Sequence, residues 1–160
     1  MAAEAEYPLL GFAFEVQIDT DIKGDKKSNL CQASFAECDG LEITMEPKVV
    51  KEGGNNRQHI HLVGAVSYGN LTLKRGMTSN IDLWNWFDAV IENDGIGANA
   101  TVTIKVLSPQ AQPERTVQRK YTLSNCLPIK IKFPPLNAKD GQIAVEELQI
   151  AYQSLTMELG

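Results

Sequence analysis

The segment Glu52–Arg57 (EGGNNR) holds the residues that most invite a chemical interpretation, a glycine pair followed by two asparagines. A loop that cradles phosphate has the pattern G-x-x-x-x-G-K-[ST] between a strand and a helix, because backbone N–H groups and a lysine must surround the anion. Here strand-like sequence lies on both sides, and neither Lys-Ser nor Lys-Thr follows. The dinucleotide pattern G-x-G-x-x-G is absent as well. We therefore interpret the segment as an exposed loop whose glycines and asparagines adopt positive φ.

Two histidines and three cysteines are the candidate metal ligands. His59 and His61 are two residues apart, so on a strand they would share a face, but no third ligand is evident nearby. Cys31, Cys38 and Cys126 lack the C-x-x-C spacing of a zinc or redox site. Their odd number, in a chain without a secretory signal, favours reduced and packed thiols over a disulfide framework. The sequence therefore predicts no metal site.

Catalytic patterns are equally weak. Nucleophilic catalysis requires a serine or cysteine held beside a base, and no G-x-S-x-G turn is present. The adjacent acids Glu146 and Glu147 would point to opposite faces of a strand, which does not suit general acid–base chemistry. We expect a protein that is not an enzyme and that needs no cofactor.

Charge and composition exclude further classes of function. The net charge is −5 and the sequence pI is about 5.0, so the basic footprint of a nucleic-acid-binding protein is missing. With 160 residues, 43% of them hydrophobic and 22% charged, the chain suits one globular domain. No apolar run approaches the roughly 18 residues of a membrane span. The segment Met1–Glu6 has two acids and no base, which predicts no secretory signal.

Most of the chain alternates apolar and polar residues, as half-buried strands do. In the segment 41–46, for example, Leu41, Ile43 and Met45 are expected to face inward, and Pro47 interrupts the strand. Asp39-Gly40 indicates a tight turn before it. Strands are predicted in the segments 12–19, 31–37, 41–46, 59–63, 68–74, 101–106, 117–123, 129–133 and 143–157.

One helix is predicted over residues 79–93, with Ser79 as its N-cap. Its apolar stripe would consist of Ile81, Trp84, Phe87, Val90 and Ile91. Trp86 would then lie on the opposite, exposed side, where a tryptophan often marks an interface. The predicted fold is mainly β, a β-sandwich or barrel with one flanking α-helix.

Several predicted strands carry polar residues along one entire face. These faces must meet water. If copies of the domain closed into a ring, such faces would line a pore, although an ordinary solvated sheet explains them equally well. The residues are Glu42, Thr44 and Glu46, then Asn70, Thr72 and Lys74, then Gln118, Lys120 and Thr122.

The order of several short motifs resembles that of a known family. The motifs are Phe14-x-Val16-x-Ile18, Phe35-x-Glu37-x-Asp39-Gly40-Leu41, Glu52-Gly53-Gly54-Asn55, Gly64, Tyr68-x-Asn70-Leu71-Thr72-Leu73-Lys74-Arg75-Gly76, Leu83-Trp84-x-Trp86, Asn125-Cys126-x-Pro128 and Ala144-x-Glu146-x-Leu148-x-Ile150-Ala151-Tyr152. Together they resemble the tail tube proteins of T4-like contractile bacteriophages. The same family includes the inner tube proteins of extracellular contractile injection systems, such as the Photorhabdus virulence cassettes and the antifeeding prophage. The resemblance covers residues 12–157.

This resemblance implies a structural protein. Six copies would form a ring whose strands join into one β-barrel around a lumen, and rings would stack into a tube inside a contractile sheath. Implied partners are further copies of the chain, the sheath, the baseplate or initiator tube proteins and a terminator cap. The cargo would be DNA in a phage or a protein toxin in an injection system. The tube would assemble in the bacterial cytoplasm, leave as part of an extracellular particle and have no stable membrane insertion.

Within this picture residues 1–160 form a single tail-tube domain, with residues 1–11 as an N-terminal extension. Residues 47–58 are the expected inter-ring loop, although a free loop remains an alternative. Trp86 is a candidate sheath or subunit interface, and a stand-alone β-sandwich binding module is the alternative function. The expected inter-ring contacts are Lys51, Glu52, Gly53, Gly54, Asn55, Asn56 and Arg57. The expected lumen-facing residues are Glu42, Thr44, Glu46, Thr72, Lys74, Lys120 and Thr122.

Overall fold

The computed structural model describes residues 9–22, 25–27, 35–54, 57–93, 99–109 and 115–160. In this part of the chain twelve strands and one helix follow one another, so the predicted mainly β fold with a single helix is confirmed. The elements are β1 (Phe14–Ile22), β2 (Asp25–Lys27), β3 (Glu37–Asp39), β4 (Ile43–Met45), β5 (Lys48–Val50), β6 (Ile60–Leu62), β7 (Val66–Tyr68), β8 (Asn70–Gly76), α1 (Asp82–Glu92), β9 (Ala100–Leu107), β10 (Val117–Lys132), β11 (Val145–Ala151) and β12 (Ser154–Leu159).

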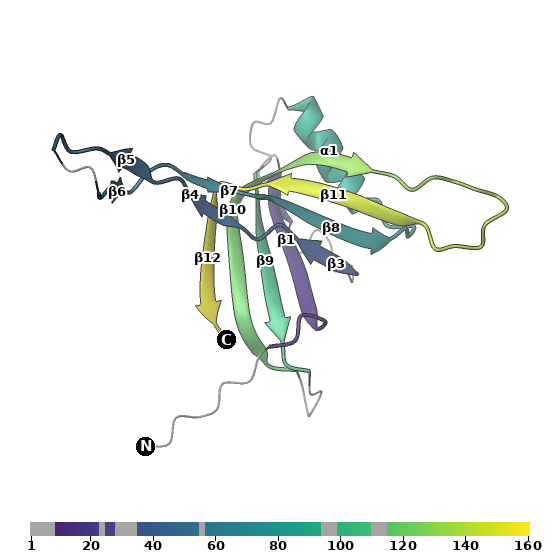
Figure 1. Cartoon of the computed structure of the whole chain (residues 1–160). Helices are drawn as coiled ribbons and strands as arrows, with labels where there is room; N and C mark the ends of the chain where they lie inside the picture. Colours follow the sequence, from purple (N-terminus) through teal and green to yellow (C-terminus); the bar gives the residue numbers. More distant parts are fainter. Residues whose placement is uncertain (1–8, 23–24, 28–34, 55–56, 94–98, 110–114) are drawn as a thin grey trace, which may run out of the picture.

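Two antiparallel sheets share the long strand β10 (Figure 1). The first half of β10 pairs with β12 on one side and with β9 on the other, and β9 is followed by β1 and β2. We call these strands the first sheet. The second half of β10 pairs with β11, followed by β8 and β3; this is the second sheet. The ladder shifts between Leu123 and Cys126, where Asn125 has a positive φ of 51°. Such an irregularity lets one strand turn from one sheet into the other, so the two strands predicted at 117–123 and 129–133 are one.

The core lies between these sheets, and strand alternation builds it. Val16 and Ile18 of β1, with Val102 and Ile104 of β9, are buried on the inner face of the first sheet. Leu71, Leu73, Leu148 and Ile150 belong to the same cluster and come from β8 and β11. Burying side chains of this size contributes about 1.5–3 kcal/mol each. The alternate residues of every one of these strands consequently face away from the core.

The segment predicted as one strand at 143–157 forms two. β11 ends at Ala151 and β12 begins at Ser154, and each pairs with a different half of β10. At the bend between them, the backbone N–H of Gln153 donates to the carbonyl of Ser124 at 3.1 Å. The break is tertiary in origin, because both strands follow the change of direction of β10.

The face of helix α1 that packs on the core is not the apolar stripe predicted from the sequence. Trp86 is 0% exposed and Leu83 is buried, whereas Trp84 is 41% exposed, and Ile81 lies just before the helix and is exposed as well. Leu83, Trp86 and the partly buried Val90 have the i, i+3, i+7 spacing of a helix face, one step around the helix from the predicted stripe. The prediction that Trp86 lies at an exposed interface is therefore wrong. This structure contains no helix, among the described residues, with the length and apolar character needed to span a bilayer.

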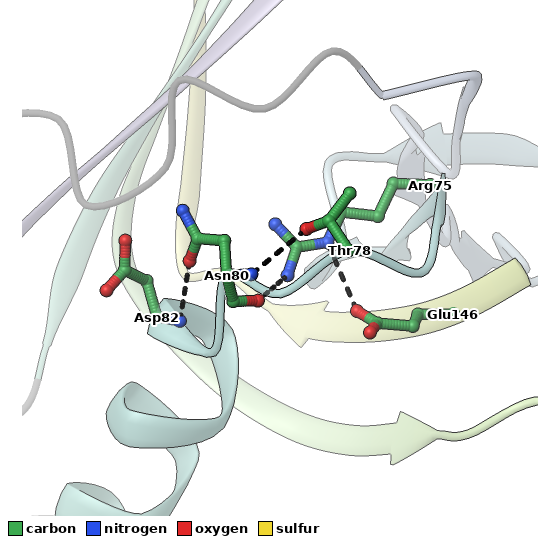
Figure 2. Close-up of polar contacts among 5 residues, drawn as sticks. All are labelled: Arg75, Thr78, Asn80, Asp82 and Glu146. Atoms are coloured by element: carbon green, nitrogen blue, oxygen red, sulfur yellow. Dashed lines mark hydrogen bonds and ion pairs between the residues drawn. The ribbon is translucent and has the colours of Figure 1, made fainter.

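A buried ion pair fixes the start of α1 (Figure 2). Arg75 Nε donates to Glu146 Oε2 at 3.1 Å, and their side chains are 2% and 11% exposed. Arg75 Nη2 also donates to the carbonyl of Asn80 at 3.0 Å. The predicted N-cap Ser79 is wrong, because the N-cap residue is Ile81, which makes no side-chain capping bond. Asn80, just before it, accepts at Oδ1 from the backbone N–H of Asp82 at 2.8 Å. The last residues of β8, the first of β11 and the beginning of α1 are thereby held together.

Candidate functional site: a projecting arm and free sheet edges

The segment between β3 and β8 forms a two-stranded arm that projects from the body, at the left of Figure 1. β4 pairs with β7, and β5 pairs with β6 farther out. Between the two pairs Glu46 and Pro47 face three residues, Val63–Ala65, which is a bulge, and the N–H of Glu46 donates to the carbonyl of Ala65 at 3.1 Å. A Cβ on Gly64 would collide with the carbonyl oxygen of Glu46, so the bulge requires glycine there.

Apolar side chains of the arm are uncovered. The prediction that Ile43 and Met45 face the core is wrong: both are more than half exposed. Directly opposite Met45 across the ribbon lies Val66, also exposed, so one face of β4–β7 is apolar. A two-stranded ribbon is marginally stable alone, and a large exposed apolar patch marks an interaction surface. The apolar arm residues, 39–78% exposed, are Ile43, Met45, Val49, Val50, Ile60, Leu62, Val63 and Val66.

The base of the arm is held by Tyr152, a residue to which the sequence assigned no role. Its hydroxyl donates to the carbonyl of Gly40 at 2.8 Å and accepts from the N–H of Glu42 at 3.1 Å. Its ring lies 5.6 Å from that of Tyr68, centroid to centroid, on the returning strand. Gly40 has a φ of +95°, and a Cβ there would collide with the carbonyl of Asn70, so the predicted turn also brings two backbones together. The arm is thus anchored on both of its strands.

The tip of the arm contains the predicted contact residues. Lys51, Glu52 and Arg57 are exposed there, and Asn55 and Asn56 lie outside the described residues. Gly54 has a φ of +96°, as expected, whereas Gly53 does not have a positive φ. Nothing lies within 4 Å of a Cβ built on either glycine. The glycines therefore lie at a turn in open space.

The predicted lumen residues fall on three separate parts of the molecule. Glu42, Thr44 and Glu46 are exposed at the arm. Thr72 and Lys74 alternate with core residues of β8 and lie on the outer face of the second sheet. Lys120 and Thr122 lie on the outer face of the first sheet, with Leu123 buried between the sheets. Since the outer faces of a sandwich point in opposite directions, these seven residues cannot line one lumen.

Both outer faces are polar, and an exposed ion pair between described residues lies on each of them. Lys74 lies 3.1 Å from Glu37 on the second sheet. On the first sheet, Lys120 lies 3.5 Å from Glu158. Exposed pairs of this kind contribute about 0–1 kcal/mol, so neither face gains much stability from them. The two sheets differ more clearly in the pairing of their edge strands.

The first sheet has two long strands with an unpaired edge in the described part of the chain. β12 pairs only with β10, and β1 is covered by β2 only at Thr20–Ile22. Met157 and Leu159 are opposite Tyr121 and Arg119, on the core-facing side of β12, yet they are 58% and 81% exposed. The sandwich is therefore open at this edge. An open apolar edge promotes association with another strand.

The thiols of Cys38 and Cys126 are poorly disposed to act as nucleophiles. Burial raises the pKa of Cys126 to about 11, and it raises the pKa of Cys38 to about 11, with the charge of Asp39 adding to the effect. Both thiols stay protonated at neutral pH, which makes them poor nucleophiles. Cys31 lies outside the described residues. Among the residues with described positions, no three of His, Cys, Asp or Glu gather in a way that could hold a metal ion.

Comparison with known proteins gives a consistent picture. The sequence matches the family described as T4-like virus tail tube protein gp19 over residues 10–156. No curated protein matches the chain. Among solved structures, a chain of the anti-feeding prophage baseplate is 26% identical, with 96% of this chain and 97% of that one covered and a TM-score of 0.78.

Two further structures share the fold. A chain of the PVC extracellular contractile injection system, in its extended sheath–tube complex, is 21% identical, with 98% and 95% coverage and a TM-score of 0.77. A chain of the anti-feeding prophage cap is 22% identical, with 100% of both chains covered and a TM-score of 0.77. The fold of this chain is thus one that occurs in a baseplate, a sheath–tube complex and a cap.

Proposed function

Because the chain belongs to the T4-like virus tail tube protein family, we propose that it is the inner tube subunit of a contractile injection particle. Six copies form a ring, and stacked rings form a rigid hollow tube that sheath contraction drives through a target envelope. The observation that carries this proposal is the anchored arm with its uncovered apolar side chains. A monomer has no use for such a surface, whereas a stacked assembly buries it.

Ring closure uses the two free edges of the first sheet. β12 of one copy pairs with β1 of the next, so that neither edge remains open. The neighbouring subunit then covers Met157 and Leu159. Because the two edges are different surfaces, the contact is heterologous and closes only through rotation into a ring.

The outer face of the first sheet consequently lines the lumen. In this arrangement Lys120 and Thr122 line the lumen, whereas Thr72 and Lys74 lie on the outer face of the second sheet, away from the lumen. Among the side chains that the structure describes, each copy contributes two lysines and three acids to this face, together with several hydroxyl groups. A nearly balanced, hydrated wall lets DNA or a protein toxin pass without strong binding. The charged residues are Glu15, Asp19, Lys105, Lys120 and Glu158.

The partners follow from the same architecture. The sheath surrounds the tube, an initiator or baseplate protein starts it, and a cap ends it. Solved structures of similar chains come from a baseplate, a sheath–tube complex and a cap, which supports these partners. The tube assembles in the bacterial cytoplasm and leaves with the particle.

Electron microscopy of the purified chain tests the proposal. We expect rings or tubes from the full chain, and no tubes after deletion of residues 52–57, which removes the arm tip. Circular dichroism should show an unchanged β spectrum for the deletion variant, because the described residues of the tip, 52–54 and 57, are exposed and lie outside the core cluster. A full chain that stays monomeric at every concentration would instead favour a stand-alone β-sandwich binding module. Normal tubes from the deletion variant would refute the role of the arm tip in stacking.

A further inference from the structure

The arm and the loop between β10 and β11, residues 133–144, project past opposite edges of the first sheet. Tyr152, which anchors the arm, lies two residues before Ser154, where β12 begins. The arm therefore leaves the body beside the β12 edge, and Figure 1 shows it extending past β12, whereas the loop extends past β1. Both projections follow the direction that joins these two edges. In a ring closed through β12 and β1, this direction leads from one copy to the next.

The arm is long enough to lie across a neighbouring copy. Its outgoing half, residues 42–50, is extended, and a chain of this length spans about 30 Å. The strands β12, β10, β9 and β1, spaced by about 4.8 Å, give each copy about 19 Å of ring wall. In a closed ring the arm would therefore cross the junction between β12 and the neighbour's β1 and continue over that neighbour.

The half of the arm nearest the body has an apolar face at the place where it would cross the junction. Ile43, Met45 and Val66 are each about half exposed, and Met45 lies directly opposite Val66 in the β4–β7 ribbon. The anchor at Tyr152 lies at the base of this same half. The direction of the apolar face is consequently set by the body and not by the tip.

The loop offers a second uncovered apolar surface. Leu136 and Ile143 are each 83% exposed, one in the outgoing half of the loop and one in the returning half. A depression of about 710 Å³ lies between these halves, and both side chains contribute to its walls. The N–H of Met77 donates to the carbonyl of Ala144 at 2.8 Å, which ties the returning half to the end of β8. The loop is therefore anchored to the body, as the arm is.

A second copy in the same ring is the occupant that fits both surfaces. The arm of each copy extends past β12 onto one neighbour, and the loop of that neighbour extends past β1 in the opposite direction (Figure 1). Arm and loop would thus cross the same junction side by side, apolar against apolar. Their contact would continue the junction of the edge strands, where Met157 and Leu159 are uncovered as well. A monomer leaves all of these side chains in water.

We propose that the arm of each protomer clasps the next protomer of the same ring, with the apolar face of β4–β7 packed on Leu136 and Ile143 of that protomer's loop. The inference rests on the proposed function, because it assumes a ring closed through β12 and β1. Arm and loop are different surfaces, so the contact is heterologous and closes after one turn of the ring. The tip at residues 51–57 lies farther out than β4–β7 and is not needed for the clasp.

Cross-linking between two variants of the chain tests the clasp. One variant carries Met45→Cys and the other carries Ile143→Cys, and both have Cys31→Ser and lack residues 52–57. They are mixed as monomers, allowed to assemble and treated with a short bismaleimide. Rings without the arm tip should form and not stack, so a cross-link between the two variants can arise only within a ring. We expect a covalent pair that contains one copy of each variant.

Two controls define the background of this experiment. The native thiols of Cys38 and Cys126, with pKa values raised to about 11, should react slowly with the maleimide at neutral pH. Thr122→Cys replaces Ile143→Cys in the matched control, because Thr122 lies on the outer face of the first sheet, away from the loop. No covalent pair with Met45→Cys should form there.

The outcomes separate the clasp from the proposed function. Rings without the covalent pair would overturn the clasp and leave ring closure by the sheet edges in place. A pair that forms only in stacked tubes of chains with the arm tip would place the contact between rings and overturn the clasp as well. Rings from the full chain, with none from the chain that lacks residues 52–57, would assign ring closure to the tip and overturn the role of β4–β7. A full chain that forms no rings at any concentration would refute the proposed function itself.

A substitution in the loop gives an independent measurement. Leu136→Asp with Ile143→Asp places two carboxylates in the proposed contact, and ring formation should then need at least about tenfold more protein. Lys139→Glu is the matched control, because it changes the charge of the same loop by the same amount at a residue that does not line the depression. It should leave the required concentration unchanged. Circular dichroism checks that both variants fold, and an unchanged concentration for the double variant would overturn the clasp.

Discussion

The buried pair of Arg75 and Glu146 allows a quantitative prediction. Glu146→Gln removes the carboxylate charge while keeping the shape of the side chain. Arg75 then remains buried beside a neutral amide, whose oxygen can still accept from Nε but carries no charge to balance the guanidinium. Removing one partner of a buried ion pair costs about 3–5 kcal/mol, because a charge stays desolvated without its counter-ion. For a domain of this size, each kcal/mol lowers Tm by about 2–4 °C, so the midpoint should fall by about 6–20 °C.

The exposed pair of Lys74 and Glu37 supplies the control. Glu37→Gln breaks an ion pair of the same length, 3.1 Å, whose lysine, Lys74, precedes Arg75 on β8. This pair is exposed to water. Its expected cost is below about 1 kcal/mol. The double variant Arg75→Met with Glu146→Leu removes both charges and should recover most of the loss, because apolar replacement of a buried pair is often neutral or stabilising.

Thermal unfolding should be measured in the background that lacks residues 52–57, since ring stacking would add concentration-dependent stability. Hydrogen exchange at the N–H of Asp82 gives a second readout, because the pair also holds the carbonyl of Asn80 at the start of α1. Equal losses for Glu146→Gln and Glu37→Gln would refute the reasoning, since burial would then have no energetic consequence.

Three further predictions follow from the anchor, the sheets and the thiols. Tyr152→Phe leaves the N–H of Glu42 without its acceptor, so urea unfolding should show a loss of about 1–3 kcal/mol, and an unchanged midpoint would contradict the anchoring role. In sealed tubes, a bulky thiol reagent should label Thr72→Cys and spare Thr122→Cys, while the reverse pattern would place the lumen at the second sheet. The unfolded chain ionises Cys126 above about pH 9 and the folded chain only near pH 11, so stability should hold below pH 9 and fall from pH 9 to 11. Cys126→Ala should reduce the slope in that part of the urea-unfolding profile and leave the share that Cys38, with a pKa also raised to about 11, contributes; an unchanged slope would exclude the Cys126 thiol as a cause.

Local alternation predicted the strands well, because side chains of a strand must alternate between core and water whatever the topology. It could not place sheet boundaries. Pro128 and the bend at Asn125 suggest two strands, yet β10 runs through both. Helix α1 shows a second limit: residues 81–91 contain two apolar stripes, and the sandwich admits the one with Leu83 and Trp86.

The arm shows why the candidate site was only partly predictable. Its polar tip was recognised from glycine and asparagine. Ile43 and Met45 have the same alternation as core residues, and sequence alone does not tell a core from a surface that a second molecule covers. The exposed position of these residues needed the structure. The predicted lumen residues are divided between faces for a related reason, since a polar face has the same pattern on either sheet.

Strand β10 has a mechanical consequence. A tube driven from one end must pass a compressive load through every subunit. In this chain the sheet proposed to close the ring and the sheet from which the arm projects contain the same sixteen-residue strand. The layers are joined by continuous backbone and not only by side-chain packing, so they cannot slide past one another without bending β10. A loaded subunit should therefore deform as one stiff body, and thrust from a contracting sheath would reach the leading ring with little loss to internal shear.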